Sequence, residues 1–178
     1  MEIRPVEPTD LPQIQAIYAD HVINGFASFE EDAPDLAEMQ RRCAELTGKG
    51  FPYLVAVESD GKVLGYAYAG PFRPRRAYRF TLENSIYLRR DAAGKGLGQK
   101  LLAALIEAAT DWGGRQMMAV IGDSANTASI RLHAKLGFQH AGLSRSVGWK
   151  HGRWLDSVLM QLALGEGDRS PVLKEPNS

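Results

Sequence analysis

The stretch from Glu83 to Leu102 constrains the fold more than any other part of the chain. It begins with residues typical of a β-strand, passes through glycines at positions 94, 96 and 98, and continues as an amphipathic helix. A glycine turn lets the backbone approach a ligand closely, because no Cβ intervenes. The helix that follows presents unpaired N–H groups and the positive end of its dipole. A strand, a glycine turn and a helix in this order are therefore expected to bind a phosphate group.

Two common nucleotide-binding motifs do not fit this turn. A P-loop requires Gly-Lys followed by Ser or Thr, and no such triplet occurs in the sequence. A dinucleotide-binding fingerprint read from Gly94 requires Gly or Ala at the position of Gln99. A short glycine pattern also occurs where a strand and a helix simply pack together. The rest of the chain has to decide between a ligand site and packing.

The composition is that of a globular domain without a strong overall charge. A chain of 178 residues favours one domain, which we place at residues 1–164. The tail at residues 165–178 has little apolar content and is expected to be flexible. Lys and Arg together number 21, as do Asp and Glu, so no overall field attracts nucleic acid or a membrane surface, and neither partner is expected.

The cysteine and histidine content argues against disulfides and metal sites. Cys43 is the single cysteine, which excludes an intramolecular disulfide and suits a reducing compartment, so a cytoplasmic location is expected. It falls on the apolar stripe of a predicted helix, which indicates a core residue and not a nucleophile. His21, His140 and His151 show no metal-ligand spacing, and no metal is expected.

Turn signals and hydrophobic periods predict strands and helices that alternate in the second half of the chain. Helix caps are expected from Thr9 or Asp10, from Asp35 and from Asn126. An Asp-Gly pair between two β-rich runs predicts a hairpin. The order β-α-α-β-β-β-α-β-α-β-β predicts a mixed sheet with helices on its faces. The expected strands are Glu2–Val6, Tyr53–Glu58, Val63–Ala69, Phe80–Leu88, Gln116–Ile121, Phe138–Val147 and Trp154–Leu162.

Two segments at a characteristic separation resemble a known family. The run Ala93-Gly94-Lys95-Gly96-Leu97-Gly98 is similar to the pyrophosphate loop of the GNAT N-acetyltransferases, although Ala93 stands where that family has Arg or Gln. The run from Asn126 to Phe138 resembles the family's second conserved segment, with His133 where many members have a tyrosine that protonates the departing thiolate. The resemblance implies the α/β GNAT (acyl-CoA N-acyltransferase) fold, a mixed and mostly antiparallel central sheet flanked by helices.

Further segments resemble one group within that family, the enzymes that acetylate phosphinothricin, methionine sulfoximine or methionine sulfone. They include Tyr68-Ala69-Gly70-Pro71-Phe72 and Lys150-His151-Gly152-Arg153-Trp154, and the likeness runs from about Ile3 to Leu164. The resemblance implies transfer of an acetyl group from acetyl-CoA to the α-amine of a small amino-acid-like substrate. It also implies a homodimer, as in related acetyltransferases.

The resemblance assigns cofactor-binding roles along both segments. Backbone groups of Ile86, Tyr87 and Leu88 are expected at the pantetheine arm. Asn126 and Lys135 are expected at the far end of the cofactor. The pyrophosphate is expected to lie on Gly94, Lys95, Gly96, Leu97, Gly98 and Gln99.

Glu83 and His133 are the candidate catalytic residues. Glu83 is the only acid among six arginines between residues 73 and 90. By resemblance it is the general base, and His133 assists it or protonates the thiolate. From the residues alone, Glu83 can also be a structural carboxylate whose pKa an arginine lowers, and a lone histidine such as His133 is usually a satisfied core residue.

The substrate side is expected to combine an aromatic wall with arginines. A guanidinium would suit the carboxylate or phosphinate of an amino-acid substrate, although a basic loop can also be simply solvated. The candidate substrate residues are Phe29, Arg73, Pro74, Arg75, Tyr78, Glu83, Asn84 and Ser85. Two alternatives stay open: an enzyme that acetylates a peptide N-terminus or another amino acid, and a module that binds acyl-CoA without catalysis. The arginine-rich loop disfavours a polyamine as the acceptor.

Overall fold

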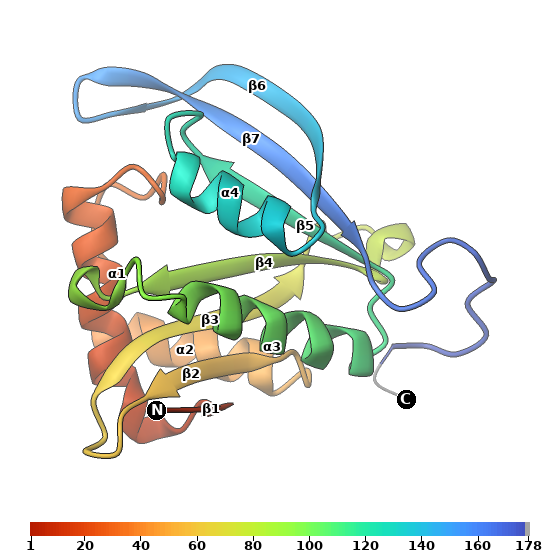
Figure 1. The fold of residues 1–178 in the computed structure, drawn as a ribbon, viewed down its shortest axis with the longest axis horizontal. Coiled ribbons are helices and arrows are strands. Elements are labelled where there is room, and N and C mark those ends of the chain that lie inside the picture. Colours follow the sequence, from red (N-terminus) through yellow and green to blue (C-terminus); the bar gives the residue numbers. More distant parts are fainter. Residues whose placement is uncertain (177–178) are drawn as a thin grey trace.

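The computed structural model describes residues 1–176 as one seven-stranded sheet with helices on both faces (Figure 1). The strand order is β1-β2-β3-β4-β5-β7-β6, and only β4 and β5 pair in parallel. The strands are β1 (Glu2–Pro5), β2 (Tyr53–Val57), β3 (Val63–Pro71), β4 (Thr81–Leu88), β5 (Gln116–Gly122), β6 (Gln139–Lys150) and β7 (Arg153–Ala163). The helices are α1 (Leu11–Asn24), α2 (Leu36–Thr47), α3 (Leu97–Asp111) and α4 (Thr127–Lys135), with short 3₁₀ turns η1 (Pro8–Asp10), η2 (Arg76–Tyr78) and η3 (Arg90–Ala92). The predicted element order and the mixed, mostly antiparallel sheet are confirmed.

The strands alternate their side chains between two cores. In β2, Val55 packs with the apolar residues of α1 and α2, whereas Leu54 and Ala56 pack with α3. In β4, Tyr87 packs toward α1 and α2, and Leu82 toward α3. Figure 1 shows α3 and α4 together on one face of the sheet. The sheet therefore separates an α1/α2 face from an α3/α4 face.

Two of the predicted helix caps are confirmed and one is wrong. The side chain of Asp35 accepts a hydrogen bond from the backbone N–H of Glu38, and Asn126 starts α4 in the same way. Asp10 precedes α1 without capping it, because its carboxylate accepts from the Arg4 guanidinium and from the backbone N–H of Glu7. The carboxylate predicted to cap α1 therefore binds Arg4 of β1 and the backbone of Glu7 instead.

The parallel pair in the centre of the sheet comes apart toward its carboxyl ends. β4 and β5 pair only from Thr81 with Gln116 to Asn84 with Ala119. β4 continues to Leu88 and β5 to Gly122, so beyond Asn84 the two strands diverge. A cleft can open there because neither strand has another partner on that side.

The segment after Leu164 hydrogen bonds to the domain. The Arg115 guanidinium donates to the carbonyls of Gly167 and Ser170, at 2.7 and 2.9 Å. The guanidiniums of Arg76 and Arg79 bind Glu175. Flexibility of residues 165–178 stays a prediction, and residues 177–178 lie outside the described part. Among the described residues, no helix is long and apolar enough to cross a membrane.

Candidate active site

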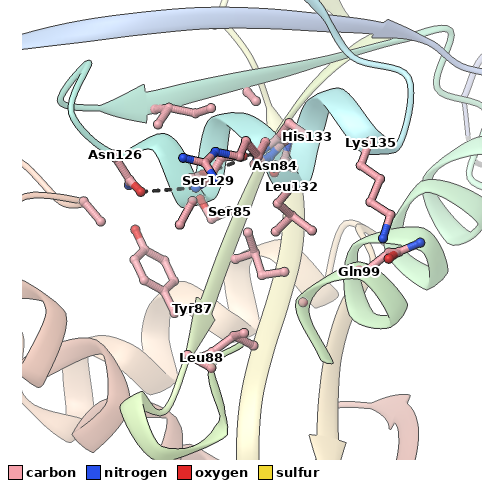
Figure 2. A pocket seen from close by; sticks show the side chains of 18 of the residues that line it. Asn84, Ser85, Tyr87, Leu88, Gln99, Asn126, Ser129, Leu132, His133 and Lys135 are labelled. Carbon is pink, nitrogen blue, oxygen red and sulfur yellow. Dashed lines mark hydrogen bonds between the residues drawn. The ribbon is translucent and has the colours of Figure 1, made fainter. Parts of the chain in front are cut away.

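A cavity of about 470 Å³ fills the cleft between β4 and β5, roofed by the start of α3 and by α4 (Figure 2). Its lining brings together residues from the glycine turn, β4, β5 and α4. The residues expected from sequence that line it are Asn84, Ser85, Ile86, Tyr87, Leu88, Gly94, Gly96, Gly98, Gln99, Asn126, His133 and Lys135. Segments that lie far apart in the sequence therefore share one site.

One end of the cavity has the features of an anion site. Gly94 and Gly96 have φ of +77° and +79°, and nothing lies within 4 Å of a Cβ at either position. Glycine is thus required at both positions by the left-handed backbone conformation, which residues with a Cβ rarely adopt, and not by a lack of space. α3 begins at Leu97 directly after them, so its free N–H groups face this end. Lys135 and Gln99 lie close together here in Figure 2.

Gly98 has a different role from the other two glycines of the turn. A Cβ at Gly98 would lie 3.3 Å from side-chain atoms of both Leu132 and Leu88. Its absence lets α3 approach α4 and β4 closely. Two expected cofactor residues in the turn do not line the cavity, because the Lys95 ammonium donates to the Asp91 carbonyl and the side chain of Leu97 is buried in the core.

The far end of the cavity is separated from the anion end by the length of α4. Asn126 precedes the helix and Lys135 ends it, so the structure does not bring these two expected cofactor residues together. The Oδ1 atom of Asn126 is engaged as the cap of α4, 3.2 Å from the N–H of Ser129. Ala27 and Gly122 also line the cavity, from the loop before α2 and the end of β5, and sequence reasoning missed both.

The edge of β4 along the cavity is free of strand partners. Residues 85–88 pair with β3 on one side only, because the pairing with β5 stops at Asn84. A ligand in the cleft can therefore hydrogen bond to this backbone edge. The end of the strand is held by His21, whose Nε2 donates to the Leu88 carbonyl at 2.8 Å. Sequence reasoning saw no role for His21, and no local pattern signals this contact.

His133 is buried and bonded on both ring nitrogens. Its Nδ1 lies 2.8 Å from the carbonyl oxygen of Ser129, and its Nε2 lies 3.0 Å from Oδ1 of Asn84. The amide nitrogen of Asn84 donates in turn to the carbonyl of Met118 on β5. Burial lowers the pKa of His133, while its hydrogen bond to the Ser129 carbonyl acts in the opposite direction. The residue of β4 that hydrogen bonds to His133 is thus Asn84 and not Glu83, and sequence reasoning missed this link.

Glu83 lies on the other face of β4. Strand alternation points it to the α1/α2 face, with Ser85 and Tyr87, and away from Asn84 and His133. The structure therefore does not place Glu83 and His133 in contact. Burial raises the pKa of Glu83, and among residues 1–176 it forms no salt bridge. The expectation that an arginine lowers this pKa is wrong.

A tyrosine stands beside Glu83 on the same face. Tyr68, on β3, lies directly opposite Ser85 of β4 in the sheet. Burial raises the pKa of the Tyr68 hydroxyl, and the charge of Glu83 raises it further. Ser85 also lines the cavity, so Tyr68 lies beside a residue of the cleft.

The other expected substrate residues lie outside the cavity lining. The ring of Phe29 packs on Gly148, where a Cβ would come within 2.5 Å of a ring atom. Arg73, Pro74, Arg75 and Tyr78 precede β4, at the end of the strand opposite to the glycine turn. The Arg73 guanidinium lies 5.7 Å from the centroid of the Tyr78 ring. Among the described residues, no group of three His, Cys, Asp or Glu side chains is placed to hold a metal ion.

Comparison with known proteins identifies relatives along nearly the whole chain. The acetyltransferase (GNAT) domain family matches residues 3–159. The phosphinothricin N-acetyltransferase of Alcaligenes faecalis is 57% identical over 166 residues, which are 93% of this chain and 84% of that protein. The L-methionine sulfoximine/L-methionine sulfone acetyltransferase of Pseudomonas paraeruginosa is 47% identical over 169 residues, covering 95% of this chain and 98% of that protein.

A solved structure matches at the level of the whole fold. The crystal structure of a GNAT superfamily phosphinothricin acetyltransferase from Sinorhizobium meliloti in complex with AcCoA superimposes with a TM-score of 0.95. The two sequences are 47% identical, and the match covers 98% of this chain and 94% of that one.

Proposed function

This chain belongs to the GNAT acetyltransferase family and is an acetyl-CoA-dependent N-acetyltransferase, and we propose that its acceptor is the α-amine of a small amino acid of the phosphinothricin, methionine sulfoximine or methionine sulfone type. One observation carries the proposal most directly: a cleft between β4 and β5 that has an anion site at one end and a buried carboxylate on the opposite face of the sheet. The names of the relatives support the class of acceptor.

The cleft has the donors that acetyl-CoA requires. The N-terminus of α3 with Gly94 and Gly96, joined by Lys135, offers backbone N–H groups and a cation to the pyrophosphate. The free edge of β4 offers backbone groups to the amides of the pantetheine arm. The cofactor supplies an acetyl group already activated as a thioester. The protein therefore mainly has to place an amine against that carbonyl carbon.

Glu83 is the proposed proton acceptor. The reference pKa of an α-ammonium is about 7.7–8.0, so much of the substrate is protonated at neutral pH and must lose a proton before it can attack. Glu83 lies on the α1/α2 face, which leaves the α3/α4 face to the cofactor. Burial raises its pKa, which makes it a stronger base than an exposed carboxylate. The nitrogen then attacks the carbonyl carbon, the carbon–sulfur bond breaks and the thiolate takes up a proton.

His133 is proposed to act on the cofactor's side, apart from Glu83. It lines the cavity on the α3/α4 face, where its Nε2 is engaged with Asn84. A proton on Nε2 is the candidate source for the departing thiolate, and it has to leave its hydrogen bond to Asn84 Oδ1 for this step. This separates the two roles that the sequence assigned to one pair.

Arg73 and Arg75 are the residues proposed to bind the carboxylate or phosphinate of the substrate. Arg73 and Arg75 carry no salt bridge among residues 1–176, whereas Arg76 and Arg79 are bound to Glu175. The planar guanidinium fork suits an anionic substrate group. Arg75 is exposed, and the Arg73 guanidinium rests against the aromatic rings of Phe72 and Tyr78.

A panel of amines tests the proposal. Thiol release from acetyl-CoA is measured with phosphinothricin, methionine sulfoximine, methionine sulfone, an unmodified amino acid, a peptide N-terminus and a polyamine. We expect turnover with the first three and much less with the others. Turnover only with the peptide or the polyamine would overturn the proposed acceptor class. Binding of acetyl-CoA without thiol release for any amine would favour the alternative of a non-catalytic module.

We also propose that the chain forms a homodimer and that it is located in the cytoplasm. β6 is an edge strand, and its hairpin with β7 exposes Trp149 and Trp154. Exposed large aromatics on the hairpin at the edge of the sheet fit an interface with a second copy of the chain. Light scattering at micromolar concentration should give twice the chain mass, and the monomer mass would contradict this. The single thiol, buried Cys43, suits a reducing compartment.

A further inference from the structure

A two-residue turn brings two cations of the final hairpin together. His151 and Gly152 both have positive φ, +49° and +77°, which is the conformation of a tight hairpin turn. Lys150 and Arg153 flank the turn and face each other across the two strands. Both side chains reach the loop at residues 25–35, which joins α1 to α2. The two tryptophans that precede and follow them are exposed instead.

Lys150 is the more unusual of the two cations. Its side chain is only 1% exposed, and its Nζ donates to the carbonyl oxygen of Ser28 at 2.8 Å. Among the described residues this is the only hydrogen bond of the Lys150 side chain. Burial lowers the pKa of the ammonium group. A buried charge is costly compared with an apolar side chain of similar size. The hydrogen bond fixes the position of the loop backbone at Ser28.

Arg153 contacts the same loop at Phe26, two residues before Ser28. Its guanidinium carbon lies 4.0 Å from the centroid of the Phe26 ring, and the group also pairs with the buried carboxylate of Asp123. The same ring and the ring of His151 form a T-shaped contact, with 5.4 Å between their centroids. The loop is thereby linked to the hairpin and to the end of β5.

Two glycines let the loop come close to the sheet. A Cβ at Gly122 would lie 2.7 Å from the carbonyl oxygen of Phe26 and 2.9 Å from that of Ala27. A Cβ at Gly148 would lie 2.5 Å from the ring of Phe29. The loop therefore contacts β5 just before Ser28, at residues 26 and 27, and β6 just after it, at Phe29.

We propose that Lys150 and Arg153 are positioning residues that hold residues 26–29 as a wall of the amine-binding end of the cleft. Ala27 lies between the two anchored residues and lines the cavity. It borders a hollow together with Gly122 and Asn126, at the end away from Gln99 and Lys135. The anion site occupies the other end, so the acceptor has to enter beside this wall. The inference rests on the proposed function, because it assigns this end of the cleft to the amine.

The test separates binding of the amine from binding of acetyl-CoA. In Lys150→Met and in Arg153→Met, we expect the KM for the amine to rise by about 10- to 100-fold, because a small displacement of a positioning wall is enough for such a loss. The dissociation constant of acetyl-CoA, measured by calorimetry, should change by less than about twofold, because the anion end is untouched. Lys150→Arg keeps a cation that can donate to the Ser28 carbonyl, and it should restore part of the loss.

Arg145→Met is the matched control, since it removes an exposed cation from the same strand without touching the loop. It should leave both constants at the wild-type values. An equal loss of amine and acetyl-CoA binding in Lys150→Met and Arg153→Met, with no rescue by Lys150→Arg, would show a merely structural role and overturn the inference.

Amide hydrogen exchange provides a readout that does not need activity. In both methionine variants, the amides of residues 26–30 should exchange about tenfold faster or more than in the wild type, with α3 unchanged. Unchanged exchange in this loop would overturn the inference even if the enzyme is active. If the wild type releases no thiol with any amine, the proposed acceptor fails, and the exchange measurement still decides whether the hairpin holds the loop.

Discussion

The Nε2 atom of His133 lies 3.0 Å from Oδ1 of Asn84, and this contact joins α4 to β4 at the point where β4 leaves β5. Both partners of the imidazole are acceptor oxygens, since Nδ1 faces the Ser129 carbonyl and the Asn84 amide nitrogen is engaged with Met118. The two acceptors favour a ring with both nitrogens protonated, whereas burial favours the neutral ring. A buried histidine held in this balance is suited to exchange a proton during turnover.

Replacing His133 should reduce stability more than cofactor binding. His133→Leu leaves the buried Oδ1 of Asn84 without its donor and removes the imidazole from the Ser129 carbonyl. We expect a loss of about 1–3 kcal/mol in the free energy of unfolding. Urea denaturation checks this value, and His133→Gln, which keeps one donor, should lose less. Equal stability of His133→Leu and the wild type would show that the contact is not formed in solution.

The separation of Glu83 and His133 predicts additive effects on turnover. The two side chains lie on opposite faces of the sheet, and the described contacts do not link them. The free-energy losses of Glu83→Gln and His133→Ala, from kcat, should therefore add within about 0.5 kcal/mol in the double mutant. If the double mutant is no worse than the weaker single mutant, the two residues act as one unit and this account of their roles is wrong.

The glycine turn offers a matched pair of substitutions. Gly96 and Gly61 both have positive φ, +79° and +84°, and nothing lies within 4 Å of a Cβ at either position, so Asp brings similar backbone strain to both. Only Gly96 lines the cavity. Gly96→Asp should weaken acetyl-CoA binding by about 100-fold or more, because it brings a negative charge to the pyrophosphate. Gly61→Asp should keep the rise in melting temperature that acetyl-CoA produces. Equal affinity in the two variants would remove the turn from the cofactor site.

Glu83 should reduce the stability of the fold at neutral pH. Burial raises its pKa above the usual 4.5, so the folded protein holds this proton more tightly than the unfolded chain does. Stability from this group is present below pH 4.5 and is lost as the pH rises through the raised value. Glu83→Gln should therefore melt higher than the wild type at about pH 7, with the difference vanishing near pH 4. Thermal melts across this range check the sign, and a wild type that melts higher at pH 7 would indicate a stabilising partner for Glu83.

The sequence predicted best what depends on neighbouring residues. The glycine turn before α3 and the caps of Asp35 and Asn126 are properties of short segments, and the structure confirms them. The order of strands and helices follows from the same local periods. The glycine turn and the second segment therefore located most of the cavity lining.

The contacts that the sequence did not predict depend on sheet pairing. Asn84 and His133 are 49 residues apart, and Lys150 and Ser28 are 122 residues apart, so no local pattern could reveal them. Proximity in sequence was misleading for Glu83, because strand alternation and the position of η2 keep the arginines of that segment from pairing with it. Arg76 and Arg79 of this segment form salt bridges with Glu175 instead.

The most direct test of the central claim is kcat against pH for the wild type and Glu83→Gln with the best amino-acid substrate of the panel. The account predicts that Glu83→Gln loses about 10²–10⁴-fold in kcat at neutral pH while acetyl-CoA affinity is kept, because glutamine cannot accept the proton. Wild-type activity should rise with pH as the buried carboxylate and the substrate amine deprotonate. The variant should recover toward high pH, where the amine is already neutral. A kcat of Glu83→Gln close to that of the wild type at neutral pH would show that Glu83 is structural and contradict the account.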